Sequence, residues 1–116
     1  METETGQRVG PLEIIPRKRA VMLGDEPVKV TAKEYELLTL LASVPTRVFT
    51  HNELIRNIWG VEALSESEAV KDRKLFHLAH SLHWKLRRQG GDARFVLSVW
   101  GVGYRLIDPD DWGIAV

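Results

Sequence analysis

The sequence has 116 residues, of which 44% are hydrophobic and 28% are charged, and it carries 16 basic side chains, 16 acidic side chains and no cysteine. This length and composition predict a single globular domain, and the lack of cysteine excludes disulfides, thiolate metal ligands and a cysteine nucleophile. The longest apolar runs fall far short of the ~20 residues that cross a bilayer, so we expect no contact with a membrane. The polar residues 1–10 do not resemble a signal peptide.

The net charge of zero hides an uneven distribution along the chain. Residues 71–105 contain eight Lys and Arg against two Asp and Glu, a net charge of +6, whereas residues 1–70 and 106–116 each sum to −3. Phosphate binding depends on local positive potential and not on the total charge. The basic segment therefore indicates a surface for an anionic partner, with an ordinary solvated helix face as the alternative.

Short apolar runs follow the polar tail over residues 1–10. They lie at Leu12–Ile15 and Ala20–Leu23, and residues 28–30 alternate in the same way. Turn-forming residues separate the runs, and this pattern is typical of short antiparallel strands. The N-terminal part is therefore predicted to form a small antiparallel sheet.

Two capping boxes predict where the next two helices begin. The Thr-Ala-Lys-Glu segment at 31–34 has the spacing in which a threonine and a glutamate satisfy each other's free backbone amides. It predicts a helix over 32–43, ended by a following proline. The same spacing recurs at 50–53 and predicts a second helix that closes at Gly60.

A third helix is predicted from a capping box at 65–68 to Arg88. At about 100° per residue, one face of this helix is apolar. That core face contains Leu75, Leu78, Ala79, Leu82 and Leu86. The opposite face combines cations and aromatic rings, namely Arg73, Phe76, His77, His80, Trp84, Arg87 and Arg88.

The β-rich residues 94–100 and 102–107 predict a hairpin that turns at two nearby glycines. Trp100 then lies at the hairpin tip, where we expect its indole to be solvated. By contrast, Trp59 and Tyr104 lie on apolar stripes and are predicted to pack in the core.

Three motifs occur together and in order: Thr-Ala-Lys-Glu-Tyr-Glu-Leu-Leu at 31–38, Leu-Ile-Arg-Asn-Ile-Trp-Gly at 54–60 and Val-Gly-Tyr-Arg-Leu at 102–106. In this combination the chain resembles the winged-helix DNA-binding domain of OmpR/PhoB-type regulators. The resemblance implies an α+β winged helix-turn-helix, with a small N-terminal antiparallel sheet, three helices and a C-terminal hairpin wing. We expect this domain over 11–108, followed by a C-terminal tail at 109–116.

The resemblance also implies a function. The third helix would enter the major groove of duplex DNA and the wing would reach the minor groove. The protein would be a bacterial, cytoplasmic and nucleoid-associated transcription regulator, bound as tandem copies on direct repeats. The family's usual N-terminal phosphate-receiver domain is not in this sequence, so the domain either acts alone or belongs to a longer chain.

The predicted DNA-binding residues fall into three groups. Phosphate contacts are expected from Arg73, Lys74, Lys85, Arg87, Arg88 and Arg105. Contacts to base edges or the groove wall are expected from His77, His80, Ser81 and Trp84. Trp100 is expected beside DNA at the wing tip.

The chain departs from the family where DNA would be read. The family pattern Arg-x-Val-Asp-Val-His-Ile-x-x-Leu-Arg keeps its first arginine as Arg73, but Phe76, Leu78 and His83 replace the acidic residue, the histidine and the second arginine. At the wing tip Trp100 replaces a family arginine, and so removes a cation suited to a narrow minor groove. The DNA target therefore cannot be inherited from the family.

Other functions are less consistent with the sequence. His77, His80 and His83 are spread over about 120° of the helix, so they cannot converge on one metal ion, and we expect no metal and no cofactor. None of the motifs Gly-x-Ser-x-Gly, His-Glu-x-x-His and Gly-x-x-x-x-Gly-Lys is present, so we do not expect an enzyme.

The serious alternative is a winged-helix module that binds protein. Exposed Phe76, Trp84 and Trp100 would suit the centre of a protein interface. The partner would be RNA polymerase or its sigma factor, and the resemblance implies that the loop before the third helix, here about 61–67, can touch polymerase. Acidic residues in or beside this loop would suit a basic partner, namely Glu62, Glu66 and Glu68.

Overall fold

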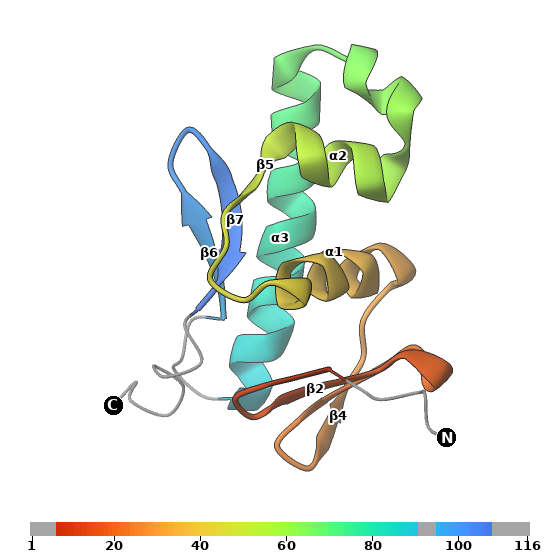
Figure 1. Ribbon diagram of the computed structural model, residues 1–116, viewed down its shortest axis with the longest axis vertical. Helices are drawn as coiled ribbons and strands as arrows, with labels where there is room; N and C mark the ends of the chain where they lie inside the picture. The colour runs from red at the N-terminus through yellow and green to blue at the C-terminus, as the bar shows by residue number, and fades with distance from the viewer. Residues whose placement is uncertain (1–6, 91–94, 108–116) are drawn as a thin grey trace.

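The computed structural model describes residues 7–90 and 95–107, which form a group of three helices with one small sheet below them and a second small sheet at their left (Figure 1). The N-terminal sheet is an antiparallel meander of β1 (Gln7–Val9), β2 (Leu12–Ile15), β3 (Ala20–Leu23) and β4 (Glu26–Val28), with the 3-10 helix η1 (Pro16–Lys18) between β2 and β3. The helices are α1 (Ala32–Ser43), α2 (His51–Trp59) and α3 (Glu68–Gly90), with the 3-10 helix η2 (Val61–Ser65) between α2 and α3. The C-terminal sheet has the order β5 (Phe49–Thr50), β7 (Gly103–Leu106), β6 (Val96–Val99).

The N-terminal sheet differs from the sequence prediction at two places. Residues 7–9, expected in a polar tail, form the edge strand β1, because Val9 pairs with Leu12 and is buried. The last strand covers 26–28 instead of 28–30. Its Pro27 is tolerated because β4 lies at the edge of the sheet, where a missing amide costs no ladder hydrogen bond.

The first two capping boxes are confirmed. Thr31 and Glu34 each bond the other's backbone amide at 2.8–3.1 Å, and Thr50 and Glu53 do the same at 2.9–3.1 Å. The third box is wrong. Ser65 is the last residue of η2 and does not cap α3. The Ser67 hydroxyl instead accepts a hydrogen bond from the backbone amide of Val70, whose apolar side chain cannot donate or accept one in return.

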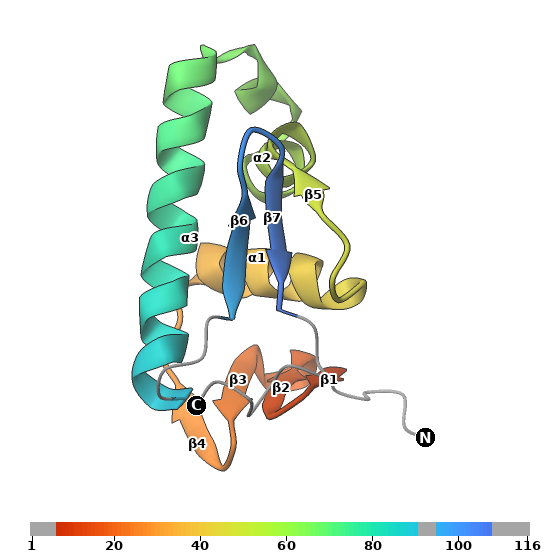
Figure 2. The ribbon, with the colours of Figure 1, turned by 90° about the vertical axis from the view of Figure 1, so that its left-hand side faces the viewer.

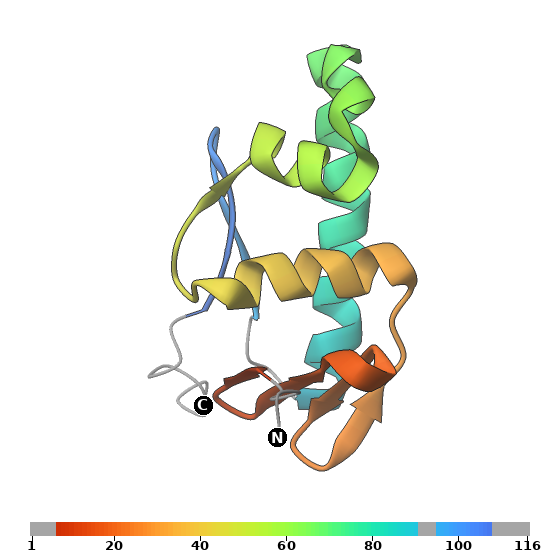
Figure 3. The same ribbon diagram turned by 45° about the vertical axis from the view of Figure 1, so that its right-hand side comes forward.

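Helices α1 and α2 cross the long helix α3, and the apolar core lies between them (Figure 3). The predicted core face of α3 is confirmed, since Leu75, Leu82 and Leu86 are fully buried, Ala79 is nearly so and Leu78 packs at the margin. Tyr104 is also buried and Trp59 packs against the core, as predicted. No helix among residues 7–90 and 95–107 is long and apolar enough to cross a membrane.

The wing is the hairpin β6–β7, which stands beside α3 with its tip at the level of α2 (Figure 2). The turn is closed by a hydrogen bond from the amide of Val102 to the carbonyl of Val99, and Gly101 occupies the left-handed region with φ 77°. The two-residue strand β5 extends this hairpin to a sheet by pairing with β7. The arrangement is the predicted α+β winged helix-turn-helix, with β5 as an element that the sequence did not predict.

Candidate nucleic-acid interface

An aromatic ladder runs along the outer face of α3. The rings of Phe76 and His80 stack at 5.4 Å with an interplanar angle of 17°, and Trp84 meets His80 edge-on at 6.1 Å. The guanidinium of Arg87 lies 5.0 Å above the Trp84 ring. Phe76 and Trp84 are 52% and 43% exposed, so this ladder is solvent-facing, as the helical periodicity predicted.

Two cations flank the ladder and have no partner among residues 7–90 and 95–107. Arg73 lies near the start of α3 and Arg88 near its end, and both are exposed. No residue in the described part of the chain forms a salt bridge or hydrogen bond with either guanidinium. Both groups are therefore available for an external anion.

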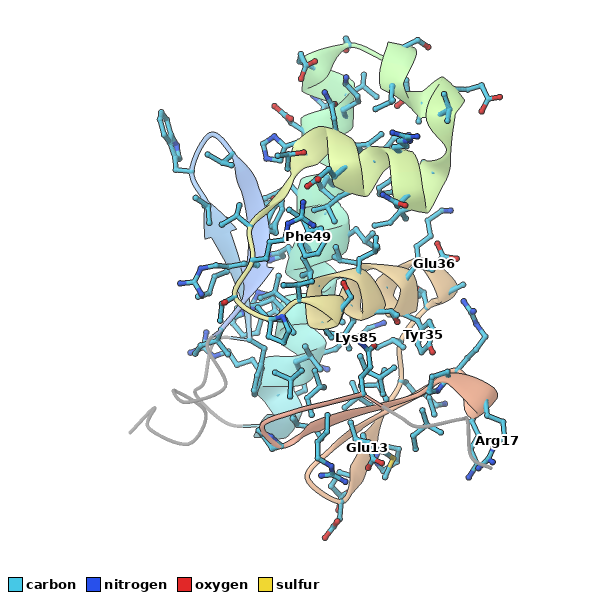
Figure 4. The ribbon with its side chains drawn as sticks, in the orientation of Figure 1. Glu13, Arg17, Tyr35, Glu36, Phe49 and Lys85 are labelled. Carbon is cyan, nitrogen blue, oxygen red and sulfur yellow. The ribbon has the colours of Figure 1, made fainter. Side chains whose placement is uncertain are left out.

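Ser81 and Lys85 do not face outward as predicted. Both lie on the side of α3 that meets α1, and both donate to the carboxylate of Glu34, with Lys85 Nζ 2.6 Å from Glu34 Oε1. Figure 4 shows Lys85 beside α1. The assignment of Ser81 and Lys85 to the DNA-binding residues does not fit this geometry, because both side chains already donate hydrogen bonds to the buried Glu34 carboxylate.

The Glu34 carboxyl is held ionised by these contacts. Its side chain is only 3% exposed, and burial alone would raise the pKa of this carboxyl. Hydrogen bonds from Lys85, Ser81 and the Thr31 amide, together with the charge of Lys85, outweigh burial and lower that pKa below its usual value.

The other expected phosphate ligands are partly engaged. Lys74 Nζ lies 2.9 Å from Glu66 Oε1 and 5.1 Å from the centre of the Trp59 ring. Arg105 is half-buried and donates from Nη1 to the carbonyl of Leu106 at 3.1 Å. These two cations are thus less available than Arg73 and Arg88.

The acidic loop is also engaged internally. Lys71, only 4% exposed, donates to Asn52 and to the carbonyl of Leu64 and pairs with Glu68 at 3.1 Å. Glu66 forms an ion pair with Lys74. Of the three predicted partner-binding acids, Glu62 alone forms no ion pair within the described residues.

A groove of about 410 Å³ separates α3 from the wing. Its helix side includes Phe76, Ala79 and His80, and its wing side includes Leu97, Val99 and Trp100. Trp100 is 95% exposed at the wing tip, as the sequence predicted. The groove therefore joins the aromatic ladder to the wing in one continuous surface.

His51 lines this groove and Asp72 lies beside it, and sequence reasoning missed both residues. His51, the first residue of α2, lies with its Nδ1 3.5 Å from Asp72 Oδ1, and its ring contacts Tyr104 at 6.0 Å. Burial, with a smaller contribution from the negative charge of Asp72, raises the pKa of Tyr104. No sequence pattern links these residues, because they come from three different elements.

The geometry does not support a metal site. Within residues 7–90 and 95–107, no group of three or more His, Cys, Asp or Glu side chains is placed to hold a metal ion. His80 is instead engaged by Trp84, whose indole donates to it.

A basic and aromatic helix face beside a β-hairpin, carried by a helix-turn-helix, defines a winged-helix effector domain. The chain belongs to the family described as "Transcriptional regulatory protein, C terminal", which it matches over residues 25–106. This is the OmpR/PhoB-type effector domain that the sequence motifs indicated.

Curated relatives include the transcriptional regulatory protein SrrA of Staphylococcus aureus, 34% identical over 95 residues, and the alkaline phosphatase synthesis transcriptional regulatory protein SphR of Synechococcus elongatus, 30% identical over 105 residues. These matches cover 81% and 90% of this chain but only 37% and 39% of the relatives. The chain thus spans about two fifths of their length.

Solved structures of similar fold include two DNA complexes. The Klebsiella pneumoniae RstA DNA-binding domain in complex with the RstA box has a TM-score of 0.74 and 26% identity, covering 90% of this chain and 97% of that one. The response regulator AdeR DNA-binding domain in complex with an intercistronic region has a TM-score of 0.73 and 26% identity, covering 89% and 99%.

Proposed function

We propose that this chain binds duplex DNA in a sequence-specific manner as the effector domain of a transcription regulator. The outer face of α3 enters the major groove and the β6–β7 wing follows the adjacent minor groove. The observation that carries this proposal is the outer face of α3, where two unpaired guanidinium groups flank an exposed aromatic ladder beside the wing. Two similar domains, those of RstA and AdeR, were solved in complex with DNA, which supports duplex DNA as the ligand of this chain.

The proposed contact set is narrower than the set expected from the sequence. Phosphate contacts come chiefly from Arg73 and Arg88, with help from Arg87, Arg105 and Lys74. The residues that face base edges or the groove wall are His77, His80 and Trp84, and Trp100 lies at the minor groove. Ser81 and Lys85 act inside the fold instead.

The direct test is selection of duplexes from a randomised pool, followed by affinity measurements on the selected and on scrambled duplexes. We expect one enriched motif, bound at least about a thousandfold more tightly than scrambled DNA. Binding that is equal on all duplexes would contradict sequence-specific recognition. A motif that recurs as a direct repeat would support the tandem arrangement.

The salt dependence of DNA binding tests the two unpaired arginines. The double variant Arg73→Gln, Arg88→Gln should lower the slope of log affinity against log salt by about two units, because each lost phosphate contact releases about one counterion fewer. The matched control removes the same charge at Arg17 and Lys18, which lie on η1 across the molecule from the wing (Figure 4). An unchanged slope in the first variant, or an equal loss in the control, would contradict this docking face.

A substitution at Trp100 can distinguish DNA binding from the alternative of protein binding. The side chain is 95% exposed, and an aromatic ring this exposed suits a protein interface. If the wing lies in the minor groove, Trp100→Arg should strengthen DNA binding and steepen its salt slope by about one unit, since a narrow groove concentrates negative potential. Trp100→Gln is the uncharged control and should not steepen it. Affinity and salt slope are measured together, and weaker DNA binding by the arginine variant would contradict the wing placement.

If Trp100 instead anchors a protein partner, the arginine variant should leave DNA affinity unchanged. It should weaken the protein complex by about 2 kcal/mol or more, as loss of a buried aromatic anchor does. RNA polymerase and its sigma factor are the partners to test, together with Glu62→Gln in the loop between α2 and α3. Glu66 and Glu68 form ion pairs with lysines of this chain, whereas Glu62 forms none within the described residues.

A further inference from the structure

A hydrogen bond within α3 determines which atom of His80 can contact a ligand. The indole Nε1–H of Trp84 donates to Nε2 of His80 over 3.0 Å. A neutral imidazole carries one N–H and one bare nitrogen, and the bare nitrogen is the acceptor. Because Nε2 accepts from Trp84, the proton of the neutral His80 ring must lie on Nδ1.

The neighbouring rings hold the imidazole in this orientation. Phe76 stacks on one side of His80 with an interplanar angle of 17°, and Trp84 meets it edge-on at 76°. These residues are one helical turn before and one after His80, so the arrangement belongs to α3 alone. His80 is exposed, and no residue in the described ranges accepts a hydrogen bond from its Nδ1.

We propose that His80 reads one base pair as a hydrogen-bond donor only, and that Trp84 is the positioning residue that fixes this character. This proposal rests on the proposed function, and it names the base chemistry that the site takes. The ligand of the Nδ1–H group is the N7 acceptor of a purine in the major groove. Guanine is preferred over adenine because the group beside N7 is the O6 acceptor in guanine but the N6 amino donor in adenine.

A base edge suits this donor better than a phosphate does. The Nδ1–H group belongs to an uncharged ring held between Phe76 and Trp84, whereas charged donors bind phosphate more strongly. The unpaired guanidinium groups of Arg73 and Arg88 already provide such donors on the same helix. His80 therefore adds direction and sequence preference, while the arginines add charge.

The tautomer is tested in the free protein. Long-range ¹H–¹⁵N correlation spectra under mildly alkaline conditions, where imidazoles are neutral, should show His80 protonated at Nδ1. Trp84→Phe keeps a ring against His80 and Arg87 but removes the indole donor, so it should release His80 to a mixture of tautomers. His77 is the internal control, because its spectrum should not change. Protonation of wild-type His80 at Nε2, or an unchanged His80 tautomer in Trp84→Phe, would overturn the proposal.

The base contact is tested on the duplex selected above, with each guanine replaced in turn by 7-deazaguanine. At one position we expect the wild-type chain to lose about 5- to 20-fold in affinity, the lower part of what a bidentate base contact provides, because His80 makes a single hydrogen bond. His80→Ala should lose as much on the natural duplex and nothing further on the modified one. Trp84→Phe should lose part of the preference, with no change in salt slope.

The outcomes separate this proposal from the proposed function. If the chain shows no preference for any duplex, the proposed function fails, and the assignment of His80 to a base fails with it. If the selected duplex is bound specifically but 7-deazaguanine acts equally on wild type and His80→Ala at every position, only the role of His80 is overturned. Equal weakening of all duplexes by His80→Ala would indicate a phosphate contact and would also overturn it.

Discussion

Gly103→Ala is expected to destabilise the domain by about 3 kcal/mol or more, at the upper end of what a single core substitution causes. A Cβ atom at this position would lie 1.7 Å from the carbonyl oxygen of Phe49 and 2.7 Å from its carbonyl carbon. These are backbone atoms of β5, so a rotamer change cannot relieve the clash. Relief requires separating β5 from β7, which breaks the pairing of Phe49 with Tyr104 and of Thr50 with Gly103.

Gly101→Ala is the matched control in the same hairpin. Gly101 has φ 77°, but an added Cβ would meet nothing within 4 Å. Its cost is therefore backbone strain alone, about 1 kcal/mol. Urea unfolding of both variants measures the two losses, and equal losses would show that β5 does not hold the wing as closely as the structure has it.

The structural features that depend only on residues close together in the sequence, such as the starts of α1 and α2, could be predicted from the sequence. The Thr31 and Thr50 capping boxes are local, because each partner lies three residues away, and both helices begin where the boxes predicted. The strand β5 has two residues and no periodicity, so only its pairing with β7 defines it. The Gly-x-Gly motif was visible at the wing, but the need for glycine at 103 comes from Phe49 and Thr50 of β5, which lie far away in the sequence.

The candidate site shows the same division. Helical periodicity placed Phe76, His80 and Trp84 on an exposed face, because the α3 helix is regular through that region. The excess of positive charge in residues 71–105 was less informative than it appeared. Lys71, Lys74 and Lys85 belong to it, but each is paired with a glutamate of this domain. The spacing of Lys71 and Glu68 is local, since they are three residues apart in α3. The pairs of Lys85 and Lys74 could not be found from the sequence, because they depend on how α3 packs against α1 and on the path of the loop before it.

Glu34→Gln should destabilise the domain by about 2 to 3 kcal/mol near neutral pH. The substitution keeps the size of the side chain but removes the charge that Lys85 and Ser81 contact, and breaking a buried ion pair leaves the remaining partner uncompensated. Lys85 is 33% exposed and can partly reach water, which keeps the expected loss below that of a fully buried pair. Glu36→Gln is the control on the same helix. Glu36 is 43% exposed and 3.9 Å from Arg19, so its loss should be at most about 0.5 kcal/mol.

The same carboxyl should make stability depend on acid pH. The pKa of Glu34 is lowered in the folded domain from its ordinary value of 4.5. A carboxyl with a depressed folded pKa stabilises the fold fully above the unfolded pKa, and this contribution is lost as pH falls through the folded pKa. Unfolding free energies measured between neutral pH and about pH 3 should therefore fall more steeply for the wild-type chain than for Glu34→Gln, and the two curves should converge at the acid end. Parallel curves across this range would mean that the bonds from Lys85, Ser81 and Thr31 do not favour the ionised form of Glu34.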